Sequence, residues 1–137
     1  IWAMISMETR KPADLLTLHG GSIVDYVCVK DCPIDKPGRI KVSHPELVGE
    51  CQVKYSDIDL NGHVNSIKYI EHILDLFPME MFREKRIRRF EMAYVAESYY
   101  GDTLSFYREQ TGENEYDVEV KKNGSEVVVR SKVIFRD

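Results

Sequence analysis

The stretch Tyr55–Asn65 reads YSDIDLNGHVN and leads into a run of apolar residues spaced three and four positions apart. This spacing predicts a helix with one buried face over Val64–Phe77, which Pro78 would end. Polar side chains occupy alternate positions of the stretch: Asp59, Asn61 and His63. An acid, an amide and an imidazole are therefore expected where a loop becomes a helix. The unpaired N–H groups of a first helical turn favour an oxygen that becomes negative during a reaction.

The segments around this helix predict an antiparallel sheet. Apolar and polar residues alternate with period two, and Asn123-Gly124 is a strong signal for a hairpin turn. The expected strands are Val48–Tyr55, Ile87–Tyr99, Thr103–Glu109, Glu115–Lys121 and Glu126–Phe135. A short helical turn is expected over Met79–Glu84. One long helix beside such a sheet buries its apolar face if the sheet curls around it. The predicted fold class is α+β, in the architecture called a hotdog.

Composition excludes several classes of protein. With 137 residues, 43% hydrophobic and 31% charged, the chain is long and apolar enough for one folded core. A net charge of −4 gives no reason to expect a nucleic acid as partner, and no apolar run is long enough to span a bilayer. Three cysteines, Cys28, Cys32 and Cys51, favour free thiols in a cytoplasmic setting over a metal half-site. Neither a metal nor a cofactor is expected.

The first third of the chain reads differently from the rest. The chain opens on Ile1–Met7 as if a strand were entered midway, so it is interpreted as a fragment whose upstream partner is missing. Residues 13–45 hold several prolines and predict an interdomain linker pinned to a surface, with strand-like content over Ser22–Lys30. Residues 46–137 are expected to be the compact domain.

The polar cluster has a plain structural interpretation and a catalytic one. Asp59 or Asn61 could cap the helix, with His63 on the surface and Glu97 a solvated carboxylate at a strand end. In a hotdog, however, the strand ending near Glu97 runs beside the helix, and its end can approach the helix entrance. A carboxylate, an amide and an imidazole would then share one pocket and could activate a water molecule.

A basic cluster stands out in this acidic chain. Its members are Arg83, Lys85, Arg86, Arg88 and Arg89. A charge run of this kind is usually a solvated face. The alternative is a site that docks an acidic partner through electrostatic attraction.

Two motifs carry a resemblance to a known family. Residues 57–70, DIDLNGHVNSIKYI, resemble the signature of plant-type and bacterial fatty acyl-ACP thioesterases, and Tyr94–Asp102 is similar to their second signature. The resemblance covers nearly the whole chain, as the second half of a tandem hotdog enzyme. It implies hydrolysis of fatty acyl thioesters on acyl carrier protein (ACP), in fatty acid metabolism. It also gives the catalytic positions as Asp59, Asn61, His63 and Glu97.

The resemblance implies a mechanism in which a water molecule attacks the thioester. Glu97 and Asn61 would position the water, His63 would assist proton transfer, and Asp59 would orient the other two. Backbone N–H groups of Gly62 and His63 would bind the developing oxyanion. The general base stays open among Glu97, Asp59 and His63.

Two positions depart from the family pattern, at Ser66 and Ser98. Ser66 stands where the family usually has asparagine. Ser98 stands where plant members often carry cysteine, which favours the attack by water. Because ACP is strongly acidic, the basic cluster gains weight as a docking site.

Two other functions remain open at this stage. One is a hotdog thioesterase that acts on acyl-CoA. The other is a non-catalytic module for acyl binding or dimerisation, because hotdog units pair edge to edge. Such a module would pair with the upstream hotdog half, or with a second copy of itself as a homodimer.

Overall fold

The computed structural model describes residues 4–137 of the chain, so residues 1–3 of the expected opening strand lie outside the described part. The chain divides into two compact units, one ending at Lys36 and one running from Pro37 to Asp137. The expected compact domain began at Glu46. The second unit begins earlier, at Pro37.

The first unit contains the 3-10 helix η1 (Leu15–Tyr26). Its N-cap is Asp14, whose Oδ1 accepts a hydrogen bond from Leu16 N at 2.9 Å. The predicted strand content of Ser22–Lys30 is therefore wrong, because residues 22–26 lie in η1 and residues 27–30 form no strand. The turns of η1 are separated by a kink, where Gly20 and Gly21 adopt positive φ angles of 65° and 82°. Glycine adopts this conformation without steric cost, so two short helical turns form around it. Before η1, Ile5 pairs with Pro12 in a single antiparallel bridge.

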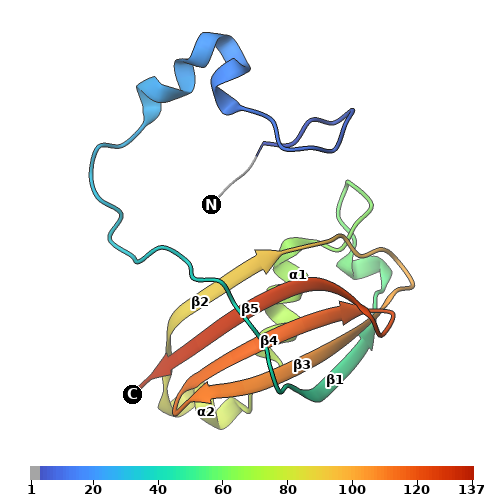
Figure 1. The fold of residues 1–137 in the computed structure, drawn as a ribbon. Coiled ribbons are helices and arrows are strands. Elements are labelled where there is room, and N and C mark those ends of the chain that lie inside the picture. Colours follow the sequence, from blue (N-terminus) through green and yellow to red (C-terminus); the bar gives the residue numbers. More distant parts are fainter. Residues whose placement is uncertain (1–3) are drawn as a thin grey trace. The chain divides into compact units, whose positions relative to one another are not determined.

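The second unit is an antiparallel sheet curled around one helix, as predicted for a hotdog (Figure 1). Its strands stand in the order β1-β3-β4-β5-β2. Their bounds are β1 Glu46–Gln52, β2 Arg86–Tyr94, β3 Thr103–Gly112, β4 Glu115–Lys122 and β5 Glu126–Arg136. The helices are η2 Tyr55–Asp57, α1 Ser66–Leu74 and α2 Met79–Glu84. Residues 123–125 connect β4 to β5, and Asn123 and Gly124 adopt the positive φ angles of 50° and 81° that an Asn-Gly hairpin turn requires.

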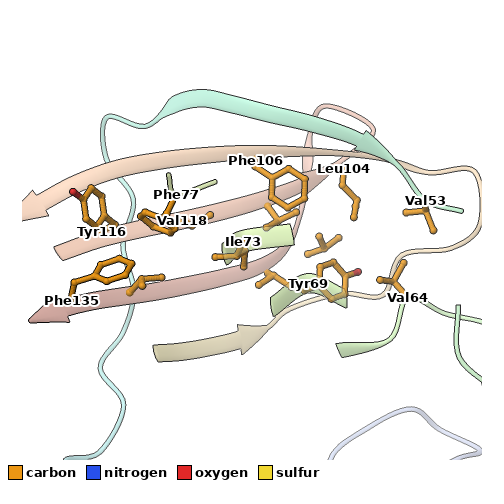
Figure 2. Close-up of a cluster of buried hydrophobic side chains, with 14 residues drawn as sticks. Val53, Val64, Tyr69, Ile73, Phe77, Leu104, Phe106, Tyr116, Val118 and Phe135 are labelled. Atoms are coloured by element: carbon orange, nitrogen blue, oxygen red, sulfur yellow. The ribbon is translucent and has the colours of Figure 1, made fainter. Parts of the chain in front are cut away.

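The core lies between α1 and the concave face of the sheet (Figure 2). From the helix side it receives Tyr69 and Ile73, and Phe77 follows just beyond the helix end. The sheet contributes alternate residues of its strands: Leu104, Phe106, Tyr116, Val118, Val120, Val129, Val133 and Phe135. This packing buries the apolar face that the spacing in the sequence predicts.

A strap formed by residues 37–45 leads into β1 and packs against the rest of the second unit. Figure 1 shows it passing across the sheet on the side opposite α1. Ile40 in the strap is buried, and Ser43 N donates a hydrogen bond of 2.7 Å to Glu109 Oε2 on β3. These contacts attach residues 37–45 to the domain, and the role of residues 13–45 as an interdomain linker stays a prediction.

Candidate active site

The loop that precedes α1 is a tight turn closed by its own backbone. Ile58 and Val64 form an antiparallel bridge, and Asp59 N donates to His63 O at 2.9 Å. Within the turn, Asp59 Oδ1 accepts from Asn61 N at 2.8 Å, and Asp59 O accepts from Gly62 N at 3.0 Å. Gly62 has a φ of 84°, a conformation that other residues adopt only with strain. The carboxylate of Asp59 therefore shapes the loop that presents His63.

The cap of α1 is Asn65, whose Oδ1 accepts from Ile67 N at 3.0 Å. The interpretation of Asp59 or Asn61 as the cap is therefore wrong, because the helix begins at Ser66 and Asn65 satisfies its first turn. Asn65 N in turn donates to Asp57 O at 2.8 Å. The buried Asp57 accepts from Lys54 N at 2.8 Å, and its Oδ1 lies 3.7 Å from His72 Nε2 on α1. These contacts fix the loop to the helix.

Glu97 lies in the loop that follows β2, because the strand ends at Tyr94 rather than at Tyr99 as predicted. The ladder ends there since Val95 N and Ala96 N both donate to Val128 O, at 2.8 and 3.2 Å. The loop then meets the α1 entrance, where Val64 N donates to Ser98 O at 2.8 Å.

The structure brings Glu97 to His63, as the catalytic interpretation requires. Glu97 Oε2 lies 3.8 Å from His63 Nε2, and the two side chains are 39% and 28% exposed. This separation is longer than a direct hydrogen bond, and such pairs often tighten only when substrate binds. A half-exposed carboxylate–imidazole pair can accept a proton from a water molecule and remains accessible to a substrate.

Asp59 and Asn61 are connected to this pair through the loop backbone. Together with Tyr55, Ser56, Ile58, Leu60 and Asn65 they line a hollow of about 650 Å³. Of the expected oxyanion donors, Gly62 N–H is already used by Asp59 O. The expectation for Gly62 is therefore corrected, because a donor engaged in the turn is not aimed at a substrate. His63 N–H donates to no backbone oxygen in the turns and loops of residues 4–137.

Tyr99 and Lys122 belong to this site and were not singled out from the sequence. Tyr99 OH donates to Glu97 Oε2 at 3.0 Å, and its ring lies edge to face with His63 at a centroid distance of 5.9 Å. Lys122 Nζ, from the end of β4, donates to the backbone oxygen of Glu97 at 2.8 Å. Only the register of the β4–β5 hairpin brings Lys122 to this loop, so local sequence holds no signal for it.

Asp102 closes the Glu97 loop. Its Oδ2 accepts from Tyr99 N at 2.9 Å, and its Oδ1 accepts from Asn123 Nδ2 at 2.9 Å. Partial burial raises the pKa of Asp102, but these two hydrogen bonds and the charge of Lys122 outweigh it and hold the pKa below its ordinary value of 3.8. A carboxylate with a lowered folded-state pKa stabilises the fold above the unfolded-state pKa, and this contribution is lost as the pH falls through the folded value.

We therefore expect Asp102→Asn to lower the Tm by a few degrees at pH 7. The difference from the wild type should shrink as the pH falls below about 4, where the wild-type carboxylate takes up its proton. Thermal unfolding from pH 7 to pH 3 measures both, with the exposed Asp75→Asn as the control variant. A difference in Tm that stays constant over this range would contradict the assignment.

The basic cluster is split between exposed and paired side chains. Lys85 Nζ donates to Asn114 Oδ1 at 2.7 Å, and Arg89 forms an ion pair with Glu91. The exposed members are Arg83 on α2 with Arg86 and Arg88 on β2, and we call these three residues the basic patch. β2 is an edge strand of the sheet, so the patch lies at the border of the fold.

The described residues contain no group of His, Cys, Asp and Glu side chains that could hold a metal ion. The three cysteines, all in the described part, are free thiols. Between Met4 and Asp137, no helix has the length and apolar character needed to cross a membrane. The groups that this site offers for chemistry are a carboxylate, an imidazole and backbone N–H groups.

Comparison with known proteins identifies similar chains. A family model described as the acyl-ACP thioesterase C-terminal domain matches residues 41–136. A dodecanoyl-[acyl-carrier-protein] hydrolase of Cinnamomum camphora is 32% identical over 99 residues, which cover 69% of this chain and 26% of that protein.

Solved structures of similar proteins agree with the fold. An acyl-ACP thioesterase of Bacteroides thetaiotaomicron is 68% identical with a TM-score of 0.89, over 96% of this chain and 53% of that one. The 12:0-ACP thioesterase of Umbellularia californica is 22% identical with a TM-score of 0.75, over 96% of this chain and 52% of that one, and shows the shared fold. The chain therefore spans about half the length of these solved proteins and about a quarter of the curated relative.

Proposed function

We propose a function that follows from the family of this chain, which belongs to the acyl-ACP thioesterase C-terminal domains. The protein that carries it hydrolyses the thioester between a fatty acyl chain and ACP, and it releases a free fatty acid and the carrier thiol. The observation that carries this proposal is the distance of 3.8 Å between Glu97 Oε2 and His63 Nε2 at the entrance of α1.

In the proposed reaction the Glu97–His63 pair takes a proton from a water molecule. The water oxygen attacks the thioester carbonyl, and the carbonyl oxygen becomes an oxyanion. The intermediate then loses its carbon–sulfur bond, and the proton held by the pair passes to the leaving sulfur. General acid–base assistance of this kind contributes roughly a hundredfold to ten-thousandfold in rate.

The loop before α1 supplies the remaining groups. His63 N–H is available for the oxyanion, and one such donor is worth about 3 kcal/mol in the transition state. Asn61 is proposed to help position the water, and Asp59 keeps the loop in shape through its hydrogen bond to Asn61 N. Ser98 is fully buried, so its hydroxyl is poorly placed to attack a substrate, and this supports attack by water.

Acyl release by the intact natural protein tests this function. Free fatty acid is measured with acyl-ACP and acyl-CoA of the same chain length, at equal concentrations. Turnover on acyl-ACP with a higher kcat/KM than on acyl-CoA supports the proposal. Preference for acyl-CoA would assign the other thioesterase class, and tight acyl binding without release would assign a non-catalytic module.

The acidic carrier is proposed to dock on the basic patch. Reversing the charge in Arg86→Glu/Arg88→Glu should raise KM for acyl-ACP about tenfold and leave kcat/KM for acyl-CoA within about twofold, because CoA, although anionic, lacks the extended acidic surface of the carrier protein. The increase in KM should fade at high salt. Lys41→Glu, an exposed charge reversal on the strap, is the matched control. An equal loss of kcat/KM on acyl-ACP and acyl-CoA would show that the basic patch does not bind the carrier.

The organisation of the longer protein is also part of this proposal. Residues 1–12 would belong to the last strand of an upstream hotdog half, residues 13–45 to the linker, and residues 46–137 to the catalytic half. Pairing with that upstream half, or with a second copy as a homodimer, would use the edge of the sheet, and a cytoplasmic location fits the free thiols. Size measurement of the intact protein by light scattering tests the oligomeric state.

A further inference from the structure

The loop that carries Glu97 is held by groups from three other parts of the fold. β5 anchors its start, since Val128 O accepts from Val95 N and Ala96 N. The α1 entrance anchors its middle through Val64 N and Ser98 O. The end of β4 and the hairpin after it supply two more hydrogen bonds. Lys122 Nζ donates to Glu97 O, and Asn123 Nδ2 donates to Asp102 Oδ1 at the end of the loop. These contacts fix the backbone of the loop, and they leave the carboxylate to be oriented by side chains.

Tyr99 donates a hydrogen bond to this carboxylate. Its hydroxyl donates at 3.0 Å to Glu97 Oε2, the same oxygen that lies 3.8 Å from His63 Nε2. Its ring stands nearly perpendicular to the His63 ring, at an interplanar angle of 87°. Tyr99 therefore touches both members of the pair and is positioned between two residues that are distant in sequence.

The tyrosine is itself held from two sides. Its backbone N–H donates to Asp102 Oδ2 at 2.9 Å. Lys122 Nζ lies 5.6 Å from the centre of its ring, within the range of a cation–π contact, and 3.3 Å from Glu126 Oε2. Tyr99 is 47% exposed, and without these contacts its side chain would rotate freely. Because the contacts already restrict the ring, less conformational entropy is lost when its hydroxyl orders Glu97.

We propose that Tyr99 is a positioning residue that orients the Glu97 carboxylate toward His63 and favours its charged form, with Lys122 holding the tyrosine in place. This inference rests on the proposed thioesterase function, in which Glu97 and His63 react with water. A hydrogen bond donated to a carboxylate favours the ionised form, which is the form that accepts a proton. The titratable and charged groups around the carboxylate include His63 before α1, Tyr69 on α1, Tyr99 in the same loop and Lys122 at the end of β4.

The test removes only the hydroxyl, in Tyr99→Phe of the intact protein, which keeps the ring contacts with His63 and Lys122. We expect kcat on acyl-ACP to fall about five- to tenfold with KM within about twofold, as for the loss of one hydrogen bond to a charged group. The acidic limb of the pH–rate profile should move to higher pH. Tyr100→Phe, the exposed neighbouring tyrosine, is the matched control and should keep the wild-type rate.

A double-mutant cycle separates positioning from a general effect on the fold. In the Glu97→Gln background, adding Tyr99→Phe should leave the residual rate unchanged, because the carboxylate on which Tyr99 acts is absent. The same five- to tenfold loss in both backgrounds would overturn the inference.

A second measurement needs no substrate. Carboxyl NMR of the free protein should show Glu97 taking up its proton about half a unit higher in pH in Tyr99→Phe than in the wild type. Identical titration curves would overturn the inference even if activity changed. If the wild type released no fatty acid from acyl-ACP, the proposed function would fail, and this titration would still decide whether Tyr99 acts on Glu97.

Discussion

Replacing Glu97 by glutamine in the intact protein should lower kcat/KM on acyl-ACP about a hundredfold or more. Glutamine keeps the size of the side chain and can still accept a hydrogen bond from Tyr99, but its amide cannot take a proton from water. His63→Ala should cause a loss of the same order, because it removes the partner 3.8 Å away. The measurement is steady-state release of fatty acid.

The combined variant gives the sharper result. Two residues that act as one unit lose their function together, so Glu97→Gln/His63→Ala should be little slower than either single variant. Glu113→Gln, an exposed carboxylate in the β3–β4 turn, is the matched control and should keep the wild-type rate. Wild-type activity in Glu97→Gln would exclude this carboxylate from the reaction.

The second large effect concerns stability and is expected for Phe77→Ala. Phe77 is buried where the chain leaves α1, with its ring 5.1 Å from Tyr116, 5.2 Å from Phe135 and 6.5 Å from Phe82 between centroids. The Arg108 guanidinium lies 5.3 Å from the centre of the same ring. Truncation should therefore cost about 3–5 kcal/mol of unfolding free energy, from lost burial, a residual cavity and lost ring contacts.

Chemical denaturation measures this loss, and the Tm should fall by more than about 10 °C. Phe77→Leu should cost much less because it fills most of the same volume. Leu47→Ala, at a site that is 53% exposed on β1, should change the unfolding free energy by less than about 0.5 kcal/mol. A loss below about 1 kcal/mol for Phe77→Ala would show that this end of the core repacks.

The apolar spacing around α1 predicted burial better than it predicted helix bounds. The predicted helix covered Val64–Phe77, whereas α1 runs from Ser66 to Leu74. Val64 and Phe77 are nevertheless buried, at 7% and 6% exposure. Periodicity reports which side chains face the core, and the helix bounds depend on the Asn65 cap and the turns after Leu74, so the two need not coincide.

The period-two alternation likewise predicted the strands better than it predicted their bounds. It predicted β3, β4, β5 and their hairpin, since the turn Asn123-Gly124 fixes the register locally. It extended β2 to Tyr99, because alternation does not reveal that Val128 O accepts both N–H groups after Tyr94. In the first unit, Ser22–Lys30 had strand-like residues but pairs with no strand among the described residues, and helical turns formed up to Tyr26 instead.

The candidate site could be predicted where it is local in sequence. Asp59, Asn61 and His63 share one turn, so a short motif contains them. Tyr99 and Lys122 depend on how a hairpin and a loop meet in three dimensions, and the sequence near Glu97 does not specify that meeting. The use of Gly62 N–H inside the turn is likewise a matter of geometry that residue types do not reveal.

The contact between Val64 N and Ser98 O has a consequence for variation within this protein. It is formed by main-chain atoms alone, so it does not depend on which side chains residues 64 and 98 carry, provided that residue 64 is not proline. The backbone therefore sets the approach of the loop that carries Glu97 to the loop that carries His63.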